Sequence, residues 1–244
     1  MLWTVEDLIH AMDAKVGGDM PDGITGISID SRTIAAGEAY FAIKGDVHDG
    51  HKFVAGAYAN GAAISIVAKD WQDQLDGETG PLLIVEDVLQ ALEKLGVAAR
   101  ARTDAKIIAV TGSVGKTTTK EAMRTALSPS GPTHASDRSF NNHWGVPLTL
   151  ARMPVDTKFG IFEIGMNHPD EITPLVKMVR PHVAMIPTLR RYIWVHLLMS
   201  MKLPKRRRRF LTGSNRTEQR SSTQMMSGWV CFAIWRKLKA FQIL

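Results

Sequence analysis

The chain has 244 residues, of which 45% are hydrophobic, so it can form one large domain or two ordinary domains with a buried core. Its formal net charge is +6. Residues 189–244 hold 13 of the 30 basic side chains and one of the 24 acidic side chains. Residues 1–188 therefore have 17 basic and 23 acidic side chains, which is a net charge of −6. The single cysteine, Cys231, excludes a disulfide framework and a cysteine-based metal site, and the division of charge confines any affinity for nucleic acid to the tail.

The chain opens with a predicted amphipathic helix. Apolar residues recur at helical spacing over Val5–Met12, after the N-cap residue Thr4, and Gly17–Gly18 is expected to end the helix. Glu6 and Asp7 interrupt the start of the chain, so we expect no signal peptide and a cytoplasmic protein.

Four apolar segments of strand length follow between turn residues. The strands are expected at Ile24–Ile29, Ala39–Ile43, Ile64–Ala68 and Leu82–Val85, with a helix at Phe53–Asn60 between the second and the third. A further helix, Val88–Arg102, leads to a boundary at Thr103–Ala105. This pattern predicts a small α/β domain over residues 1–103.

Three polar turns of this first domain each carry a cationic side chain. Arg32 follows Asp30-Ser31, Lys44 precedes Gly45-Asp46, and His51 follows Asp49-Gly50. Asp, Ser and Gly are ordinary turn formers, so one interpretation is that these residues only shape the turns. The other is a site for a phosphate-bearing ligand, because Arg, Lys and His donate hydrogen bonds to phosphate oxygens.

The second half contains a pattern typical of a phosphate-binding loop. A buried-type strand, Ile107–Val110, enters the loop Thr111–Thr118, and a helix is expected from Thr117. Gly112 and Gly115 lack a Cβ atom, so the backbone can turn tightly and aim N–H groups at phosphate oxygens. The alternative is a chance glycine turn between a strand and a helix.

The polar residues of this loop suit a nucleotide triphosphate with its metal ion. Lys116 would reach the β- and γ-phosphates, and the hydroxyl of Thr117 would bind Mg²⁺. The usual spacing of the motif places a glycine at position 110, where this chain has Val110.

Further polar residues follow at the ends of later segments. A strand at Phe159–Ile164 carries Glu163, where a Mg²⁺-binding acid is often found, although a lone Glu there can equally be a solvated strand end. Asn141 and Asn142 precede Gly145-Val146-Pro147, a more specific pattern than a single turn residue.

Five motifs, in this order, resemble the Mur ligase family over residues 1–188. They are Ile29–Arg32, Gly45–Phe53, Thr111–Glu121, Asn141–Pro147 and Phe162–Asn167. The valine at position 110 agrees with the shortened loop of that family.

The resemblance implies site residues in both domains. In the first, Ser31, Arg32, Lys44 and His51 would contact the uridine-diphosphate part of a muramyl peptide. In the second, Lys116 and Glu163 would be catalytic, and Thr117 and Glu163 would hold Mg²⁺. ATP would be bound by Thr111, Gly112, Ser113, Val114, Gly115, Lys116, Thr117, Thr118, Asn141, Asn142 and Asn167.

The resemblance also implies the reaction. A substrate carboxylate, that of UDP-N-acetylmuramoyl tripeptide, would attack the γ-phosphate of ATP, and the amine of D-alanyl-D-alanine would attack the resulting acyl phosphate to form an amide. The protein would act as a monomer in peptidoglycan synthesis, without nucleic acid and without a membrane span. In the family a third domain binds the acceptor, and this sequence does not contain its motifs. The acceptor cannot be read from the sequence for this reason, so a single amino acid remains an alternative to D-alanyl-D-alanine.

The family pattern stops after Pro187. A histidine in a His-Leu stretch and a lysine in an Ala-Lys-Ala-Glu-Ile-Phe-like segment, which helps to hold a second Mg²⁺, are missing in their expected form. Instead, residues 189–244 contain three of the six Trp residues, no aspartate and the run Lys205–Arg209. With ordinary codon choices, a shifted reading frame over residues 189–228 restores both missing motifs in order, which favours a frameshift.

The sequence therefore predicts an α/β protein with three parts. These are a UDP-muramyl-peptide-binding domain at 1–103, an incomplete P-loop ATPase domain at 104–188, and a non-native, disordered tail at 189–244. We expect this chain to be inactive as written, and an inactive remnant that only binds nucleotide or UDP-sugar is one alternative. Another is a basic nucleic-acid-binding protein, since the arginine run and the amphipathic segment Trp229–Leu244 can also be explained as an anion-binding surface.

Overall fold

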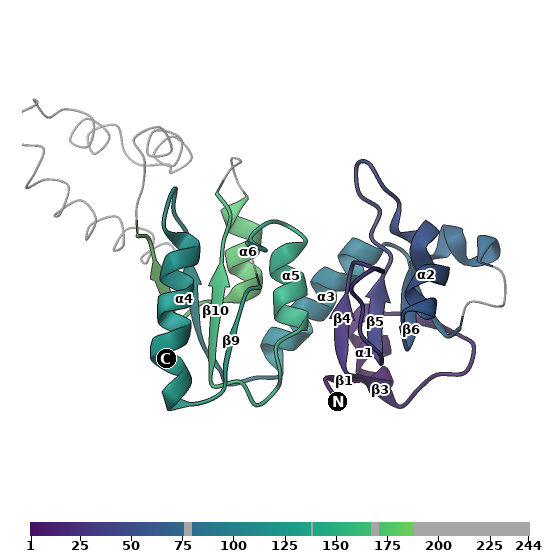
Figure 1. Cartoon of the computed structure of the whole chain (residues 1–244), viewed down its shortest axis with the longest axis horizontal. Helices are drawn as coiled ribbons and strands as arrows, with labels where there is room; N and C mark the ends of the chain where they lie inside the picture. Colours follow the sequence, from purple (N-terminus) through teal and green to yellow (C-terminus); the bar gives the residue numbers. More distant parts are fainter. Residues whose placement is uncertain (76–79, 138, 167–170, 188–244) are drawn as a thin grey trace, which may run out of the picture. The chain divides into compact units, whose positions relative to one another are not determined.

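The computed structural model describes residues 1–75, 80–137, 139–166 and 171–187, and its contacts divide these residues into two compact units (Figure 1). The first unit contains residues 1–104 and 143–157, and the second contains residues 105–142 and those from 158 onward. The predicted tail at 189–244 lies outside the described residues. Both units are mixed α/β structures, which confirms the predicted fold class.

The first unit is built on a five-stranded sheet of order β2-β7-β6-β5-β4. Strands β4 to β7 are mutually parallel, and the edge strand β2 is antiparallel to β7. Parallel strands buried on both faces are near-continuous apolar runs, as in Ile64–Ala68. The strands are β2 Lys15–Gly17, β4 Gly26–Ser28, β5 Glu38–Phe41, β6 Ile64–Ala68 and β7 Leu82–Val85.

Helix α2, Val54–Ala59, covers part of this sheet after a 3-10 turn, η1, at Gly50–Phe53. A second 3-10 segment, η2, spans Lys69–Gln74. The core cluster beneath α2 comprises Ile34, Tyr40, Ala42, Val54, Ala57, Val67, Leu82 and Ile84.

The first helix, α1, spans Val5–Met12 as predicted, with the Thr4 hydroxyl accepting the backbone N–H of Asp7 at 3.1 Å. The prediction that Gly17–Gly18 ends it was wrong. The helix ends at Asp13, which adopts a left-handed conformation with φ 57°, and the chain then forms β2. Asp tolerates this conformation because its short polar side chain can bond locally, and the edge of β7 supplies the pairing that makes β2 a strand.

The predicted strand Ile24–Ile29 is divided in two. Residues Gly23–Ile24 form β3, which pairs with β1, Trp3–Thr4, in a separate two-stranded sheet, whereas β4 joins the five-stranded sheet. Between them, the backbone N–H of Thr25 donates to Gly37 O. An apolar run predicts an extended backbone, but it does not predict that β3 pairs with β1 and β4 with β5, because these partners are distant in sequence.

Helix α5, Gly145–Ala151, lies in the first unit, although residues 143–157 follow the predicted boundary by about forty positions. All seven of its residues are buried, and it packs against α3, Val88–Ala101. Beyond it, Arg152 Nε donates to Ile27 O at 2.7 Å. A helix buried on every side requires neighbours on every side, and α3 of the first unit is one of them.

The indole of Trp3 anchors the start of the chain to the segment after α5. Its Nε1 donates to Ala151 O at 2.8 Å, and the guanidinium carbon of Arg102 lies 3.2 Å from its ring centroid. Arg102 also donates to Leu2 O at 3.0 Å and to Met153 O at 3.2 Å. One stacked pair therefore holds together three segments that are distant in sequence.

The second unit contains a four-stranded parallel sheet of order β11-β8-β10-β9. Its strands are β8 Lys106–Val110, β9 Thr133–Ala135, β10 Phe159–Glu163 and β11 Val183–Met185. Helix α4, Lys116–Leu127, runs alongside the sheet (Figure 1), and Met123 and Leu127 pack on Ile108, Val110 and Ile161. A 3-10 turn, η3, at Ser128–Ser130 follows α4, and α6, Ile172–Val179, contacts β8.

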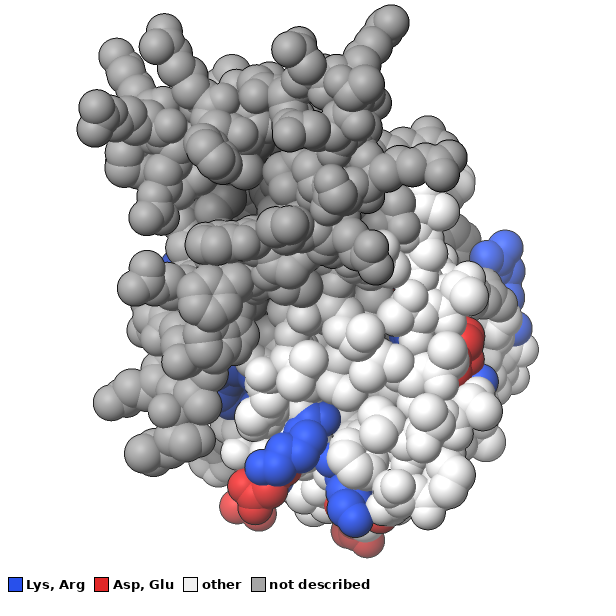
Figure 2. Space-filling view, turned by 90° about the vertical axis from the view of Figure 1, so that its left-hand side faces the viewer, with Lys and Arg blue, Asp and Glu red and all other residues white. Residues whose placement is uncertain are grey.

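The charged side chains of the described residues do not gather into one patch on the face drawn in Figure 2. On that face several basic side chains lie against acidic ones. In the part of the chain that the structure covers, no helix combines the length and apolarity that crossing a membrane requires.

Replacing Trp3 by alanine is expected to destabilise the first unit. The side chain is only 3% exposed, and removing a buried Trp typically lowers the free energy of unfolding by about 3 to 5 kcal/mol. Trp3→Phe keeps most of the packing and loses the Nε1–Ala151 hydrogen bond, at about 1 kcal/mol. Urea denaturation followed by circular dichroism measures both. Val47→Ala, at an 84% exposed position, is the control, and an equal effect of Trp3→Ala and Val47→Ala would contradict the anchoring role.

Candidate nucleotide-binding site

The loop between β8 and α4 lies at the carboxyl ends of three neighbouring strands. The register places Val110, the last residue of β8, beside both Glu163 of β10 and Met185 of β11. Thr111 fixes the start of the loop, because its N–H donates to Met185 O at 3.0 Å and its hydroxyl donates to Ile164 O at 2.9 Å. This edge is where parallel α/β sheets bind their ligands.

The backbone of the loop has the conformation that glycine permits. Gly112 has φ 154° and Gly115 has φ 84°, and Gly115 is the N-cap of α4, which begins at Lys116, one residue earlier than predicted. A residue with a Cβ is strained at such angles. The N-terminus of α4 thus opens onto the loop, and the N–H groups of a helix's first turn, together with its dipole, attract an anion.

Lys116 holds the loop closed with its own side chain. Its Nζ donates to Gly112 O at 2.7 Å, across the turn that the two glycines make. Ser113 and Thr118 belong to the same loop and helix start, and Val114 at the tip is half exposed. The ammonium group therefore lies against the backbone of the loop that is predicted to bind phosphate.

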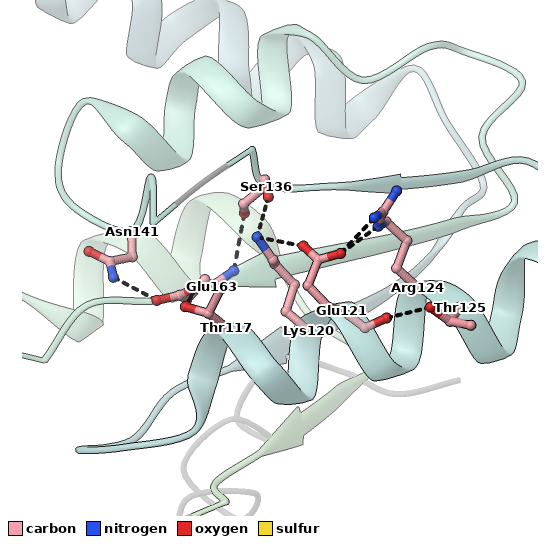
Figure 3. A network of polar contacts seen from close by, with 8 residues as sticks. All are labelled: Thr117, Lys120, Glu121, Arg124, Thr125, Ser136, Asn141 and Glu163. Atoms are coloured by element: carbon pink, nitrogen blue, oxygen red, sulfur yellow. Dashed lines mark hydrogen bonds and ion pairs between the residues drawn. The ribbon is translucent and has the colours of Figure 1, made fainter.

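Glu163 is the central residue of a polar network beside the loop (Figure 3). Its side chain is buried, with the residue 1% exposed, and both carboxylate oxygens accept hydrogen bonds. Thr117 Oγ1 donates to Oε2 at 3.0 Å, and Asn141 Nδ2 donates to Oε1 at 2.8 Å. The structure thus brings together three residues that the sequence predicted from separate motifs, and Glu163 is no solvated strand end.

The donor set of this network fits a magnesium ion. Mg²⁺ prefers oxygen ligands and commonly takes one carboxylate and one hydroxyl from a phosphate-loop protein, with the remaining positions filled by phosphate and water. Thr117 and Glu163 supply that pair at hydrogen-bonding distance. Among the described residues, no group of three or more His, Cys, Asp or Glu side chains offers an alternative metal site.

Three asparagines were also predicted to bind the nucleotide, and the structure describes two of them. Asn141 also accepts the N–H of Gly165 at 2.6 Å through its backbone oxygen, which ties its loop to the end of β10. Asn142 follows it and is half-buried. Asn167 lies outside the described residues.

Sequence reasoning missed Ser136, which supports Glu163 from behind. Ser136 Oγ accepts the backbone N–H of Glu163 at 3.2 Å, and its own N–H donates to Ile161 O at 3.1 Å. A serine after a short strand carries no signal of this kind, because the bond depends on the pairing of β9 with β10.

In the first unit, Arg32 and Ser31 lie in a turn that is organised by Asp30. Arg32 Nε and Nη2 donate to the two Asp30 carboxylate oxygens at 2.8 and 2.7 Å, and this hydrogen bond and the charge of Asp30 raise the pKa of Arg32 above its ordinary value. The oxygen of Ser31 accepts Asn60 Nδ2 at 2.8 Å. The exposed guanidinium remains accessible to a ligand, with its side chain 85% exposed.

His51 is placed differently from the other predicted substrate residues. It is 3% exposed and stacks on Trp71 with ring centroids 5.0 Å apart. The N–H of Ala68 donates to Nε2 at 2.9 Å, so Nε2 is an acceptor and the ring proton lies on Nδ1, which donates to Asp49 Oδ1 at 2.6 Å. Both ring nitrogens are engaged inside the fold, so contact between His51 and a substrate stays a prediction that this geometry does not favour.

Gly50 and Lys44 complete this turn. A Cβ on Gly50 would lie 2.7 Å from the carbonyl carbon of Ala42 and from Ile43 O, so only glycine fits, and Tyr40 donates its hydroxyl to Gly50 O at 3.0 Å. Exposed Lys44 forms a β-bridge with Asp49. Of the four predicted substrate residues, Arg32 and Lys44 are the ones whose cationic side chains are exposed.

A strand, glycine loop and helix on a parallel sheet, with a hydroxyl and a carboxylate meeting beside the loop, define a P-loop nucleotide-binding domain. A family model described as "Mur ligase family, catalytic domain" matches residues 23–95, and one described as "Mur ligase middle domain" matches residues 110–192. Together they cover more than half of the chain, which therefore belongs to the Mur ligase family, as the five motifs predicted.

Several curated relatives and solved structures are similar to this chain. UDP-N-acetylmuramoyl-tripeptide--D-alanyl-D-alanine ligases from Rickettsia prowazekii and Escherichia coli are 35% and 34% identical, each over 76% of this chain and 40% of the relative. A crystal structure of MurF from Acinetobacter baumannii has a TM-score of 0.66 and 37% identity, over 75% of this chain and 40% of that one. MurF ligase from Thermotoga maritima in complex with ADP has a TM-score of 0.55 and 26% identity, over 67% and 37%. The chain thus spans about two fifths of the length of the relatives it matches.

The hydrogen bonds of Asp49 predict a stability that depends on pH. Burial acts to raise the pKa of Asp49, but hydrogen bonds from the side chain and backbone of His51, with the charge of Lys44, outweigh it and lower this pKa below its usual value. A lowered pKa means that the ionised carboxylate stabilises the fold above about pH 4 and that this contribution is lost as the pH falls through the folded-state pKa.

Asp49→Asn is therefore expected to lower the free energy of unfolding by about 1 to 2 kcal/mol at pH 7 and by much less at pH 3. Urea denaturation at both pH values measures the difference. Asp46→Asn, at an exposed position in the same loop, is the control. A loss that is equally large at pH 3 would show that the charge of Asp49 is unimportant.

Proposed function

We propose that this chain is the substrate- and ATP-binding part of a ligase that joins D-alanyl-D-alanine to UDP-N-acetylmuramoyl tripeptide in peptidoglycan synthesis. The observation that carries the proposal is the meeting of Thr117, Asn141 and Glu163 at the mouth of the phosphate loop. The names of the relatives support the choice of substrates. Because the chain spans about two fifths of these relatives, the activity belongs to the longer protein.

In this proposal the second unit binds ATP. Lys116 exchanges its bond to Gly112 O for the β- and γ-phosphate oxygens, and the loop amides at the start of α4 donate to the same phosphates. Thr117 and Glu163 would hold Mg²⁺, which would supply positive charge to neutralise the phosphates. The ADP complex of the Thermotoga maritima ligase supports nucleotide binding at this fold.

The reaction follows from charge and position. The substrate carboxylate attacks the γ-phosphorus, the bond to the β-γ bridging oxygen breaks, and ADP leaves an acyl phosphate behind. The neutral amine of the acceptor then attacks the acyl carbon, the bond to phosphate breaks, the nitrogen gives up one proton to water, and an amide and inorganic phosphate result. In the first step the substrate carboxylate approaches the γ-phosphate, and these two anions repel each other. The ammonium group of Lys116 lowers this repulsion and stabilises the charge that spreads over the phosphoryl oxygens.

The first unit is proposed to bind the uridine-diphosphate part of the muramyl peptide. Arg32 and Lys44 offer exposed cationic donors to the diphosphate, and Ser31 lies beside Arg32. His51, which is buried, is proposed to hold the turn of Asp49 and Gly50 in shape. We further propose that the enzyme is a cytoplasmic monomer, as the resemblance to the Mur ligase family implied.

Lys116→Ala is expected to weaken nucleotide binding by the chain. Losing a charged hydrogen bond of about 1.5 to 3 kcal/mol corresponds to a rise in Kd of about 10- to 150-fold. Isothermal titration calorimetry with Mg²⁺ and ADP measures it. Lys106→Ala, an exposed lysine at the opposite end of β8, is the matched control. Equal affinities for the two variants would remove Lys116 from the site.

The choice of acceptor is tested in a version of the protein whose reading frame is restored after codon 188. Phosphate release that depends on ATP and UDP-N-acetylmuramoyl tripeptide is expected with D-alanyl-D-alanine and is expected to be lost in Lys116→Ala. Faster release with a single amino acid, such as lysine or meso-diaminopimelate, would place the protein elsewhere in the family.

A further inference from the structure

Helix α4 contains a buried lysine that the proposed reaction does not use. Lys120 is 1% exposed and lies one turn after Lys116. Lysine is almost never fully buried unless its charge is paired, because removing an ammonium group from water is costly. Met123 and Leu127, which follow Lys120 along α4, pack on the sheet, so an apolar residue would also suit the packing at position 120.

The ammonium group of Lys120 is directed at the end of β9. Its Nζ donates to Ser136 O at 2.5 Å and lies 3.2 Å from Glu121 Oε1 (Figure 3). The other Glu121 oxygen accepts Arg124 Nε and Nη2 at 2.8 and 2.7 Å. The hydrogen bonds from Arg124 and then from Lys120 lower the pKa of Glu121, so the acid stays charged and supports the lysine.

Ser136 passes this restraint on to the metal-binding strand. Its backbone N–H donates to Ile161 O, and its hydroxyl accepts the backbone N–H of Glu163 at 3.2 Å. A chain of two hydrogen bonds therefore joins Lys120 to the backbone of Glu163. The side chain of Glu163 is joined to the same helix by Thr117, three residues before Lys120.

The two connections differ once a metal ion is considered. Thr117 Oγ1 and the Glu163 carboxylate are the proposed ligands, so the geometry of their mutual hydrogen bond depends on whether both groups bind Mg²⁺, although the hydroxyl can donate its proton in either case. The connection through Lys120 and Ser136 uses neither of these oxygens. It can therefore hold α4 and β10 at the same spacing with and without Mg²⁺.

We propose that Lys120 is a positioning residue for the magnesium site, which sets the place of Glu163 relative to Thr117 through Ser136. This inference rests on the proposed nucleotide and Mg²⁺ site. Residues that orient metal ligands without touching the metal typically contribute about 10- to 100-fold to metal affinity.

The test compares ADP binding by the full chain in Mg²⁺ and in EDTA, using calorimetry, for the unaltered protein and for Lys120→Met. The strengthening of ADP binding by Mg²⁺ is expected to fall by about 10-fold in Lys120→Met, and Kd in EDTA is expected to change by less than about twofold, since the phosphate loop is untouched. Arg124→Met, which removes the other partner of Glu121, is the matched control and keeps the Mg²⁺ effect.

A second variant covers the case in which Lys120→Met does not fold. Ser136→Ala keeps the carbonyl that Lys120 binds but loses the hydroxyl that accepts the N–H of Glu163, and it is expected to lose the Mg²⁺ effect in the same way. If Lys120→Met weakened ADP binding equally in Mg²⁺ and in EDTA, the role of Lys120 would be merely structural. If Ser136→Ala left the strengthening of ADP binding by Mg²⁺ unchanged, the inference would also be overturned. No ADP binding by the unaltered chain would instead refute the nucleotide site itself, and the inference with it.

Discussion

The buried carboxylate of Glu163 imposes the strongest constraint on the second unit. A carboxylate away from water is stable only when donors replace its hydration, and here a hydroxyl from α4 and an amide from the loop after β9 do so. Those donors converge because α4 follows β8 after a short loop and because the Asn141 segment is bonded to the chain just after β10, where Gly165 N–H donates to Asn141 O. The phosphate loop, the asparagine motif and the acidic strand end are therefore parts of one arrangement, and the register of β8 with β10 aligns them.

In the first unit, by contrast, the polar residues of one predicted site stabilise a turn. Its Asp49-Gly50-His51 turn looks like a ligand-binding motif, yet the aspartate, the histidine ring and the glycine are engaged in the turn itself. Gly50 allows the backbone to approach Ala42 and Ile43, and His51 joins Asp49 to the start of η2 through Ala68 and Trp71. Such a turn presents neighbouring groups, such as Lys44, on a rigid base, which is how scaffold residues commonly serve a binding site.

Helix α5 shows how a fold can separate sequence order from spatial order. The Asn141–Pro147 motif runs across the division between the units: Asn141 donates to Glu163 in the second, whereas the helix that begins at Gly145 is buried in the first. A motif that is continuous in sequence thus has two separate tasks. Its asparagine contributes to a polar site, and its apolar part forms the buried helix α5, at whose end Trp3 and Arg102 donate hydrogen bonds to Ala151 O and Met153 O.

The sequence by itself determined the elements whose signals are local. The Thr4 cap of α1, the apolar runs of β6, β7 and β8, and the glycine loop before α4 follow from spacing and backbone preference, and so did the family. Tertiary structure decided which partner each polar side chain found. It divided Ile24–Ile29 between two sheets, buried His51, and joined Lys120 and Ser136 to Glu163. The reason is physical: periodicity fixes the backbone of a segment, but hydrogen bonds and burial depend on groups tens of residues away, which only packing brings within reach.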